Sequence, residues 1–344
     1  MKYTPLVLSA LLGLSVVGCS SISMNSSPVS LAPPPSSLLE GSAVPVVAHS
    51  DHEFLLQSAD PKLAANKRLV YDLWRTVLNA GHVEAADDYL TPDYMQHNPI
   101  ASTGREAFKA YFSTRERLDE VPEQIQDPLI TIVAEGNYVA MAFVSEYDEV
   151  DGSGTYTSTH FDVFRIEGGL IAEHWDSVQI PKGVFPAAPE DGGPLPVRGI
   201  EGLAQLAMLR SEEPALANNK RLVFDTWRHI PEAGREELAE LYLDPIYIQH
   251  NPNAVTGRAG FQEYFSKRPD SPIESYLEDP LVTMLAEGDL VVQVLQEERP
   301  NPNKPDELYY ISWIDMFRIS DGRLIEHWDT ASKGELPASM QNAE

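Results

Sequence analysis

Apolar residues recur every three to four positions after residue 60, which is the spacing of an amphipathic helix. Leu69, Leu73 and Val77 carry this repeat, and it predicts a helix over residues 62–79. The pattern that follows predicts two further helices with a short extended segment between them, and then four strands: 83–90, 94–98, 104–112, 126–134, 138–148, 155–167 and 170–179. Helices followed by a strand meander predict an α+β fold, with helices packed on one face of an antiparallel sheet.

This pattern occurs twice in the chain. The segment from Asn66 to Arg75 returns from Asn219 to Arg228, with eight of its ten residues unchanged. Three other motifs return at the same spacing of 153 residues: Tyr-x-Gln-His-Asn-Pro, Asp-x-Phe-Arg-Ile and Glu-His-Trp-Asp. A repeat of this length indicates a duplicated domain. We predict two domains with a Pro/Gly-rich linker between them and a tail after them: 61–180, 181–213, 214–334 and 335–344.

The N-terminus has the features of a secretory signal. Lys2 precedes an apolar run that is too short to span a membrane as a mature helix, and small residues end it. Val16 to Cys19 resembles the bacterial lipobox, in which the cysteine becomes the lipidated first residue; an ordinary signal peptide with an incidental cysteine is the alternative. We predict a signal peptide over 1–18, lipidation at Cys19 and a Ser/Pro-rich tether over 19–60. Ser20 favours the outer membrane, facing the periplasm.

Composition narrows the classes of partner. The chain has 52 acidic and 25 basic residues, a net charge of -27, which argues against nucleic acid and against anionic membrane surfaces. The single cysteine excludes an intramolecular disulfide and a thiolate zinc cluster. The sequence has no Gly-rich phosphate loop and no Gly-x-Ser-x-Gly elbow. We therefore expect membrane contact only through the N-terminal lipid.

The repeated motifs resemble those of SnoaL-like, polyketide cyclase-like proteins of the nuclear transport factor 2-like superfamily. Both copies carry them, over residues 61–180 and 214–334. The resemblance implies two tandem cone-shaped domains, in each of which helices and a curved antiparallel sheet enclose one pocket. Members of the superfamily include cyclases, isomerases, dehydratases and binding proteins, so the fold alone leaves the function open.

Alternation along the predicted strand 155–167 separates two faces. His160, Asp162 and Phe164 share one face, and Arg165 lies on the other, as Arg318 does in copy two. Because arginine is seldom buried, its face is expected to reach solvent or a partner, and Asp162 is expected on the concave face. Loss of hydration there is expected to raise the pKa of this carboxyl and to suit it to proton transfer.

The turn after this strand predicts how it pairs with the next strand, 170–179. Gly168-Gly169 fits a two-residue hairpin turn, which pairs Asp162 with Trp175 and Phe164 with Glu173. His174 then lies on the outer face. A one-residue slip would move every one of these side chains to the opposite face.

These arguments give the candidate site. The catalytic candidates are Asp162, His97 and His160. The ligand-binding candidates come from both copies: Trp175, Glu173, Phe164, Tyr94, Trp74, His250, Asp315 and Trp328. The two histidines at 97 and 250 are placed inward by alternation, although capping of a backbone group is the other interpretation. Trp74 also fits a core position.

Copy two has Trp313 where copy one has His160, which makes copy one the better candidate for chemistry. His97, His160 and Asp162 could in principle form a metal set of two histidines and one carboxylate, but copy two lacks the second histidine and no spacing is diagnostic, so we expect no metal. Two functions stay open. One, which the resemblance implies, is acid/base chemistry on a carbonyl compound with no cofactor, such as aldol-type cyclisation or isomerisation. The other is a non-catalytic lipoprotein that binds a small apolar ligand or a protein. The sheets of the two copies are expected to pack as a pseudo-dimer within one chain.

Overall fold

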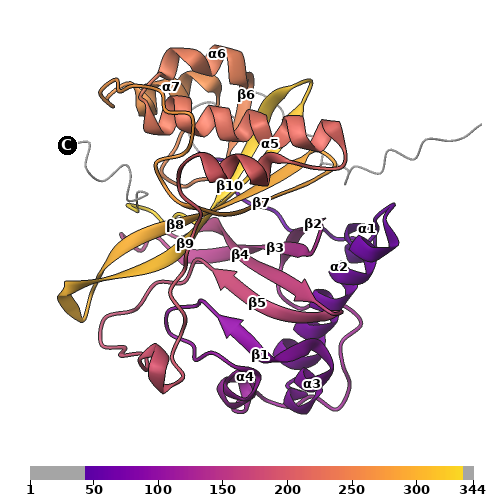
Figure 1. Cartoon of the computed structure of the whole chain (residues 1–344). Coiled ribbons are helices and arrows are strands. Elements are labelled where there is room, and N and C mark those ends of the chain that lie inside the picture. The colour runs from indigo at the N-terminus through magenta and orange to yellow at the C-terminus, as the bar shows by residue number, and fades with distance from the viewer. Residues whose placement is uncertain (1–42, 336–344) are drawn as a thin grey trace, which may run out of the picture.

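The computed structural model describes residues 43–335, so the predicted signal peptide, the lipobox and the start of the tether lie outside the described residues. The chain forms two α+β domains, each built on a five-stranded sheet. The helices lie on the two outer sides of the molecule, and the sheets lie between them (Figure 1). Within the described residues, no helix is long and apolar enough to cross a membrane.

Domain 1 begins with helices and ends with a strand meander, as the hydrophobic pattern predicted. Its helical elements are α1 (His52–Leu55), α2 (Pro61–Leu73), η2 (Trp74–Asn79), η3 (Val83–Ala85), α3 (Ala86–Tyr89) and α4 (Arg105–Phe112). Its strands are β1 (Leu90–Gln96), β2 (Leu129–Glu135), β3 (Tyr138–Asp148), β4 (Thr155–Glu167) and β5 (Leu170–Asp176). Asp60 caps the second helix through its side chain, and Pro61 occupies the first helical position, where no intrahelical N–H is needed.

Domain 2 repeats this order after two short connecting 3₁₀ helices, η4 (Pro189–Asp191) and η5 (Gly202–Leu209). Its helical elements are α5 (Pro214–Trp227), η6 (Arg228–Glu232), η7 (Glu236–Leu238), α6 (Ala239–Tyr242) and α7 (Arg258–Phe265). Its strands are β6 (Leu243–Gln249), β7 (Leu281–Glu287), β8 (Leu290–Asn301), β9 (Lys304–Ser320) and β10 (Arg323–Asp329).

The sheets are not wholly antiparallel, in contrast to the prediction. Strand order is β1-β5-β4-β3-β2 in domain 1 and β6-β10-β9-β8-β7 in domain 2. The meander strands pair antiparallel, but β1 runs parallel to β5, and β6 runs parallel to β10. The first strand can pair in parallel because the helix α4 and the following loop return the chain across the sheet before the meander begins.

Because of a β-bulge, the register of the β4–β5 hairpin differs from the predicted one. The two-residue turn at Gly168-Gly169 forms with positive φ at both glycines, and Ile166 pairs with Ile171 as predicted. One step further, Ala172 has no partner, and Phe164 pairs with His174. The extra residue moves the rest of β5 by one position. His174 therefore shares the face of Phe164, and the predicted Phe164–Glu173 pairing is wrong.

The outer faces of the two sheets share one apolar cluster. Its members come from both domains: Ile130, Val133, Ala140, Ala142, Phe161, Val163, Trp175, Val282, Leu285, Val292, Val294, Ile314, Met316 and Trp328. Two buried lysines reach across to the opposite domain. The Lys67 Nζ atom lies 2.8 Å from Glu287 Oε1, and Lys220 Nζ lies 2.6 Å from Glu135 Oε2. Burial of this apolar surface and the paired charges hold the sheets together.

The segment before each domain crosses to the other domain. The Val44 N–H donates to the Gln249 carbonyl of domain 2, and the Leu195 N–H donates to the Gln96 carbonyl of domain 1. Val46 and Val197 are both buried in the shared cluster. The end of the predicted tether and the predicted linker therefore pack as structured arms, because their Val/Leu-Pro-Val segments bury apolar side chains.

Candidate functional site

Domain 1 encloses a cavity of about 230 Å³ between its helices and the concave face of its sheet. Aromatic and aliphatic side chains form most of the wall: Leu73, Trp74, Leu78, Tyr94, Ala101, Phe108, Tyr111, Phe112, Phe164 and Val178. The polar lining consists of Gln96, Asn98, Ser102, Arg115, His160, Asp162, His174 and Asp176. A cavity with apolar walls and a few convergent polar groups is the usual form of a small-molecule site.

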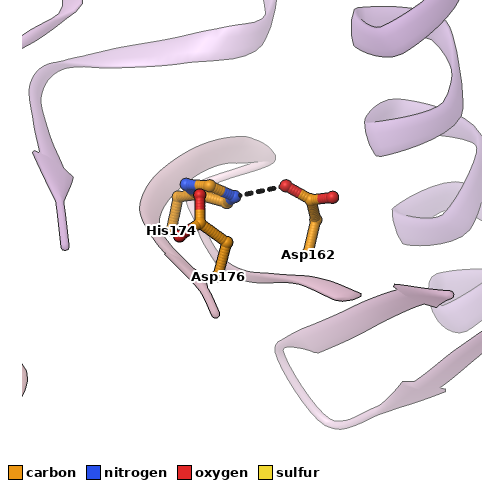
Figure 2. A group of neighbouring side chains, drawn as sticks. All are labelled: Asp162, His174 and Asp176. Atoms are coloured by element: carbon orange, nitrogen blue, oxygen red, sulfur yellow. Dashed lines mark hydrogen bonds and ion pairs between the residues drawn. The ribbon is translucent and has the colours of Figure 1, made fainter. Parts of the chain in front are cut away.

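A carboxylate between two histidines lies at the sheet side of this cavity. The Asp162 Oδ1 atom is 2.8 Å from His174 Nε2, and its Oδ2 atom is 3.1 Å from His160 Nε2. Figure 2 shows the His174 ring directed at Asp162, with Asp176 beside it on β5. Strand alternation in β4 and the bulge in β5 bring these three strand positions to one face. About a third of the His160 side chain (32 %) is accessible, whereas Asp162 is buried.

Amide side chains from the end of β1 hold the cluster in place. The Gln96 Oε1 atom accepts the Asn98 N–H and lies 2.9 Å from His174 Nδ1. The Asn98 amide donates to Asp176 Oδ2 at 2.7 Å. The Gln-x-Asn part of the motif in β1 therefore binds the His-x-Asp part of the motif in β5, which fixes the ring and both carboxylates.

The histidines set the charge of the cluster. Burial alone would raise the pKa of Asp162, but the adjoining His160 and His174 rings lower it well below its usual range. Burial disfavours the cation of His160, but the Asp162 carboxylate outweighs this and raises the His160 pKa to about 9. Burial raises the pKa of Asp176. The expectation that the Asp162 pKa is raised is therefore wrong, and His160 is the cavity-facing acid.

Three predicted site residues of copy one lie outside the cavity. Glu173 and Trp175 point to the outer face because of the bulge at Ala172, and Trp175 belongs to the interdomain cluster. His97 follows β1 on the same outer side: its ring stacks on Trp175 with centroids 5.1 Å apart, and its Nε2 atom lies 2.8 Å from Glu173 Oε1. The His97 Nδ1–H donates to the Leu195 carbonyl, so His97 binds an arm and not the cavity.

Domain 2 repeats the cluster with one substitution. Asp315 lies in the cavity lining, but His250 and Trp328 stack on each other on the outer side. The bulge in β10 moves Trp328 outward, whereas His250 is misplaced because Tyr247 and Gln249 of β6 face the cavity. Trp313 occupies the position of His160 and donates from Nε1 to Asp315 Oδ1 at 3.3 Å. The remaining cavity measures about 50 Å³. The larger indole ring fills part of the space that is open in domain 1.

The charges in domain 2 differ as a result. Burial raises the pKa of Asp315 well above its usual value, since no second histidine faces this carboxyl. Burial also lowers the pKa of His327 to about 4 and raises that of Asp329 to about 6. The same hydrogen-bond geometry therefore carries an ion pair in domain 1 and favours neutral partners in domain 2.

Two sets of side chains in the described residues have the donors that a metal ion requires. They are Asp162, His174 and Asp176 in domain 1, and Asp315, His327 and Asp329 in domain 2; in each set the donor atoms lie within 4.8 Å of one another. In domain 1 the His160 ring already provides a positive group 3.1 Å from Asp162 Oδ2. The two sets thus differ in one respect: a protonated histidine side chain adjoins the carboxylates of domain 1, and none takes its place in domain 2.

The sequence analysis identified some of the residues that line this cavity. His160, Asp162, Phe164, Tyr94 and Trp74 all line the cavity of domain 1. It missed Ser102 and Arg115, and it missed four residues of the Asp162 cluster: Gln96, Asn98, His174 and Asp176. All four belong to the repeated Gln-His-Asn-Pro and Glu-His-Trp-Asp motifs. Their recurrence in both copies was visible in the sequence, whereas the bulge that turns His174 and Asp176 inward was not.

The comparisons with known proteins match this fold. Residues 71–174 match the family model described as a SnoaL-like domain. Domain 1 contains a SnoaL-like domain. No curated protein matches the chain significantly.

Solved structures that resemble one SnoaL-like domain include TsrD from Streptomyces laurentii, at 26% identity over 35% of this chain and 90% of that chain, with a TM-score of 0.23. A protein described as a polyketide cyclase from Acidithiobacillus ferrooxidans has 18% identity over 35% of this chain and 89% of that chain, with a TM-score of 0.25. A candidate SnoaL-like polyketide cyclase from Jannaschia sp. has 19% identity over 34% and 88%, with a TM-score of 0.25. Each covers about a third of this chain.

Proposed function

We propose that domain 1 binds a small carbonyl compound and catalyses cofactor-free proton transfer on it, of the kind used in isomerisation or aldol-type ring closure. The observation that carries this proposal is the His160–Asp162 pair at the wall of the cavity of about 230 Å³. Domain 2 is proposed to be structural in this respect, because its smaller cavity holds Trp313 at the matching position.

The chemistry follows from the protonation states. With its pKa near 9, His160 carries a proton at neutral pH and can donate it to a carbonyl oxygen. The Asp162 carboxylate stays ionised and holds the imidazolium in place, a positioning role that replaces the acid/base role predicted for it. Asp176, whose pKa is raised by burial, is the proposed base. It takes a proton from the carbon beside the carbonyl, the C–H electrons form the enol double bond, and His160 protonates the oxygen.

The walls indicate the kind of substrate. Trp74, Phe108, Phe112 and Phe164 offer aromatic surface to an apolar or aromatic body. The positive His160 ring lies where a negative oxygen would develop, in a site largely shielded from water. Such a preset charge stabilises an enolate-like transition state more than it stabilises the neutral ketone.

The test compares domain 1 with the variant that domain 2 already contains. In His160→Trp, domain 1 acquires the Trp of domain 2, so the fold is expected to survive. We expect deuterium exchange at the α-carbon of 2-tetralone, followed by NMR in D₂O, to fall about 10²–10⁴-fold in this variant and in His160→Gln. Trp313→His is the matched control and is expected to leave the exchange of domain 1 unchanged. Equal exchange in wild type and His160→Gln would refute the acid role.

Binding without chemistry is the second candidate, and one observation favours it: most of the cavity wall is aromatic or aliphatic, as in a site that holds an apolar ligand. The same samples distinguish the two functions. A binding protein would hold 2-tetralone in domain 1, lose it in His160→Trp because the cavity fills, and show no exchange above the background rate in any variant.

We also propose that the chain is a lipid-anchored protein of the cell envelope, held at Cys19 in the outer membrane and facing the periplasm, and that it works as a monomeric pseudo-dimer. The support for the first part is the lipobox-like sequence around Cys19. The support for the second is the shared apolar cluster with its two crossing Lys–Glu pairs, which leaves both outer sheet faces covered. Light scattering at micromolar concentration is expected to give the mass of one chain.

A further inference from the structure

The interior of domain 2 holds two carboxyl groups with little positive charge around them. Asp315 and Asp329 are 0 % and 4 % exposed, and His327 is the only basic side chain in the lining of the cavity. The matching cavity of domain 1 has two histidines, His160 and His174, for its two carboxyl groups. Replacement of a histidine by Trp313 therefore leaves domain 2 one positive group short. Buried carboxylates are stable only when a partner compensates their charge.

We propose that Asp315, His327 and Asp329 bind one divalent first-row transition-metal ion, such as Zn²⁺ or Mn²⁺. The His327 Nε2 atom lies 3.1 Å from Asp315 Oδ1 and 4.0 Å from Asp329 Oδ2. Ligands at about 2.1 Å from a common ion are about 3.0–4.2 Å apart, so both of these distances from His327 fit a shared ion. The donor atoms of all three residues lie within 4.8 Å of one another. One imidazole and two carboxylates form a mixed nitrogen and oxygen donor set that suits Zn²⁺, Mn²⁺ or Fe²⁺.

The neighbouring amides prepare His327 as a ligand. The Gln249 Oε1 atom accepts the Asn251 N–H and lies 2.8 Å from His327 Nδ1. Because an amide oxygen only accepts hydrogen bonds, the ring proton belongs on Nδ1, and the Nε2 lone pair of the neutral ring faces the two carboxyl groups. The Asn251 amide also donates to Asp329 Oδ2 at 2.6 Å. Such outer hydrogen bonds orient the ligands of most protein metal sites.

One oxygen of Asp315 lacks a partner in the described part of the chain. The Asp315 Oδ2 atom is buried in the cavity lining and has no hydrogen-bond partner among the described residues. Its other oxygen is already shared by Trp313 and His327. A buried carboxylate oxygen without a partner is costly, and a metal ion would satisfy it. In domain 1 the corresponding oxygen, Asp162 Oδ2, faces the His160 ring, so the proposal concerns domain 2 alone.

The experiment counts metal ions bound by the full chain. Chelator-treated protein is titrated with Co²⁺, whose visible absorption reports coordination by protein ligands, and with Zn²⁺ by calorimetry. We expect one ion per chain and quenching of tryptophan fluorescence by Co²⁺, since Trp313 contacts Asp315 directly. Asp329→Asn keeps an oxygen that can accept from Asn251 and is expected to weaken binding at least tenfold.

Asp176→Asn is the matched control, because it makes the same change in domain 1 and is expected to leave one ion bound. Circular dichroism establishes that both variants are folded, and His327→Gln serves as a second variant if Asp329→Asn is not. Three results would overturn the proposal: no binding at 100 µM free Zn²⁺ or Co²⁺, unchanged binding in both domain 2 variants, or loss of the ion in Asp176→Asn. Each would mean that protons alone compensate the buried carboxyl groups of domain 2. The outcome does not depend on turnover in domain 1.

Discussion

Replacement of Trp175 by alanine separates an interface role from a pocket role. Trp175 is 5 % exposed, belongs to the cluster between the two sheets and stacks on His97. Truncation of a buried tryptophan typically costs about 3–5 kcal/mol, because the transfer free energy is lost and a cavity remains. Total stabilities of about 5–15 kcal/mol are usual, so the loss is a large part of the whole. Ligand affinity is expected to change little in the fraction that stays folded.

Urea unfolding followed by far-ultraviolet circular dichroism measures the loss. Trp328→Ala makes the matching change in domain 2 and is expected to cost a similar amount, with a double variant that is not additive because both rings share one cluster. Trp74→Ala is the pocket control: it removes a half-buried wall of the cavity and is expected to weaken ligand binding more than Trp175→Ala does. A loss below about 1 kcal/mol in Trp175→Ala, together with weakened binding, would refute the assignment of this residue to the interface.

Three further changes test other parts of the structure. Since the pKa of His160 rises from 6.5 to about 9 in the folded state, its contribution to stability is complete below pH 6.5 and disappears as the pH rises to about 9; thermal melts of wild type and His160→Gln are expected to converge by pH 9.5. Lys67→Ala leaves the half-buried Glu287 without its cationic partner and is expected to cost up to about 3 kcal/mol in urea unfolding, whereas Lys67→Met with Glu287→Gln recovers most of the loss. Cys19→Ser is expected to abolish incorporation of labelled fatty acid and to release the protein from the membrane fraction; continued labelling would exclude this anchor.

The sequence predicted the fold well because the relevant information is local and is repeated. Helical spacing in Leu69, Leu73 and Val77 and alternation around Asp162 depend only on which face is buried. The recurrence of four motifs at one spacing then defined two domains. The short Val-Pro-Val segment at residues 44–46 and the similar Leu-Pro-Val segment at 195–197 lie outside the spacing of the four motifs, and three residues are too few to indicate that each arm binds the opposite domain.

The site was harder to predict because one unpaired residue decides it. The two-residue turn at Gly168-Gly169 formed as expected, yet the bulge at Ala172 exchanged the faces of Glu173 and His174. No side-chain pattern reports such a bulge, since it depends on which backbone groups of β4 and β5 pair. The same shift moved Trp175 from the cavity to the interface, where it stacks on His97. His97 was misplaced separately, because Tyr94 and Gln96 are the residues of β1 that face the cavity. A single error of register thus explains most of the misplaced site residues.

The two domains together indicate which part of the cluster serves folding and which part serves ligand binding. Both keep the hydrogen bonds from the Gln-x-Asn segment of the first strand to the His-x-Asp segment of the last, although the cavity of domain 2 has shrunk to about 50 Å³. This network therefore does not require an open cavity. Its role in both domains is to hold the parallel edge strand, β1 or β6, against the last strand of the sheet. The variable element is the side chain at one position of the long central strand. Where it is His160, the cavity opens and the shared carboxylate has a cationic partner with access to a ligand; where it is Trp313, the space closes and the carboxyl group needs a proton or a metal ion in place of the lost cation.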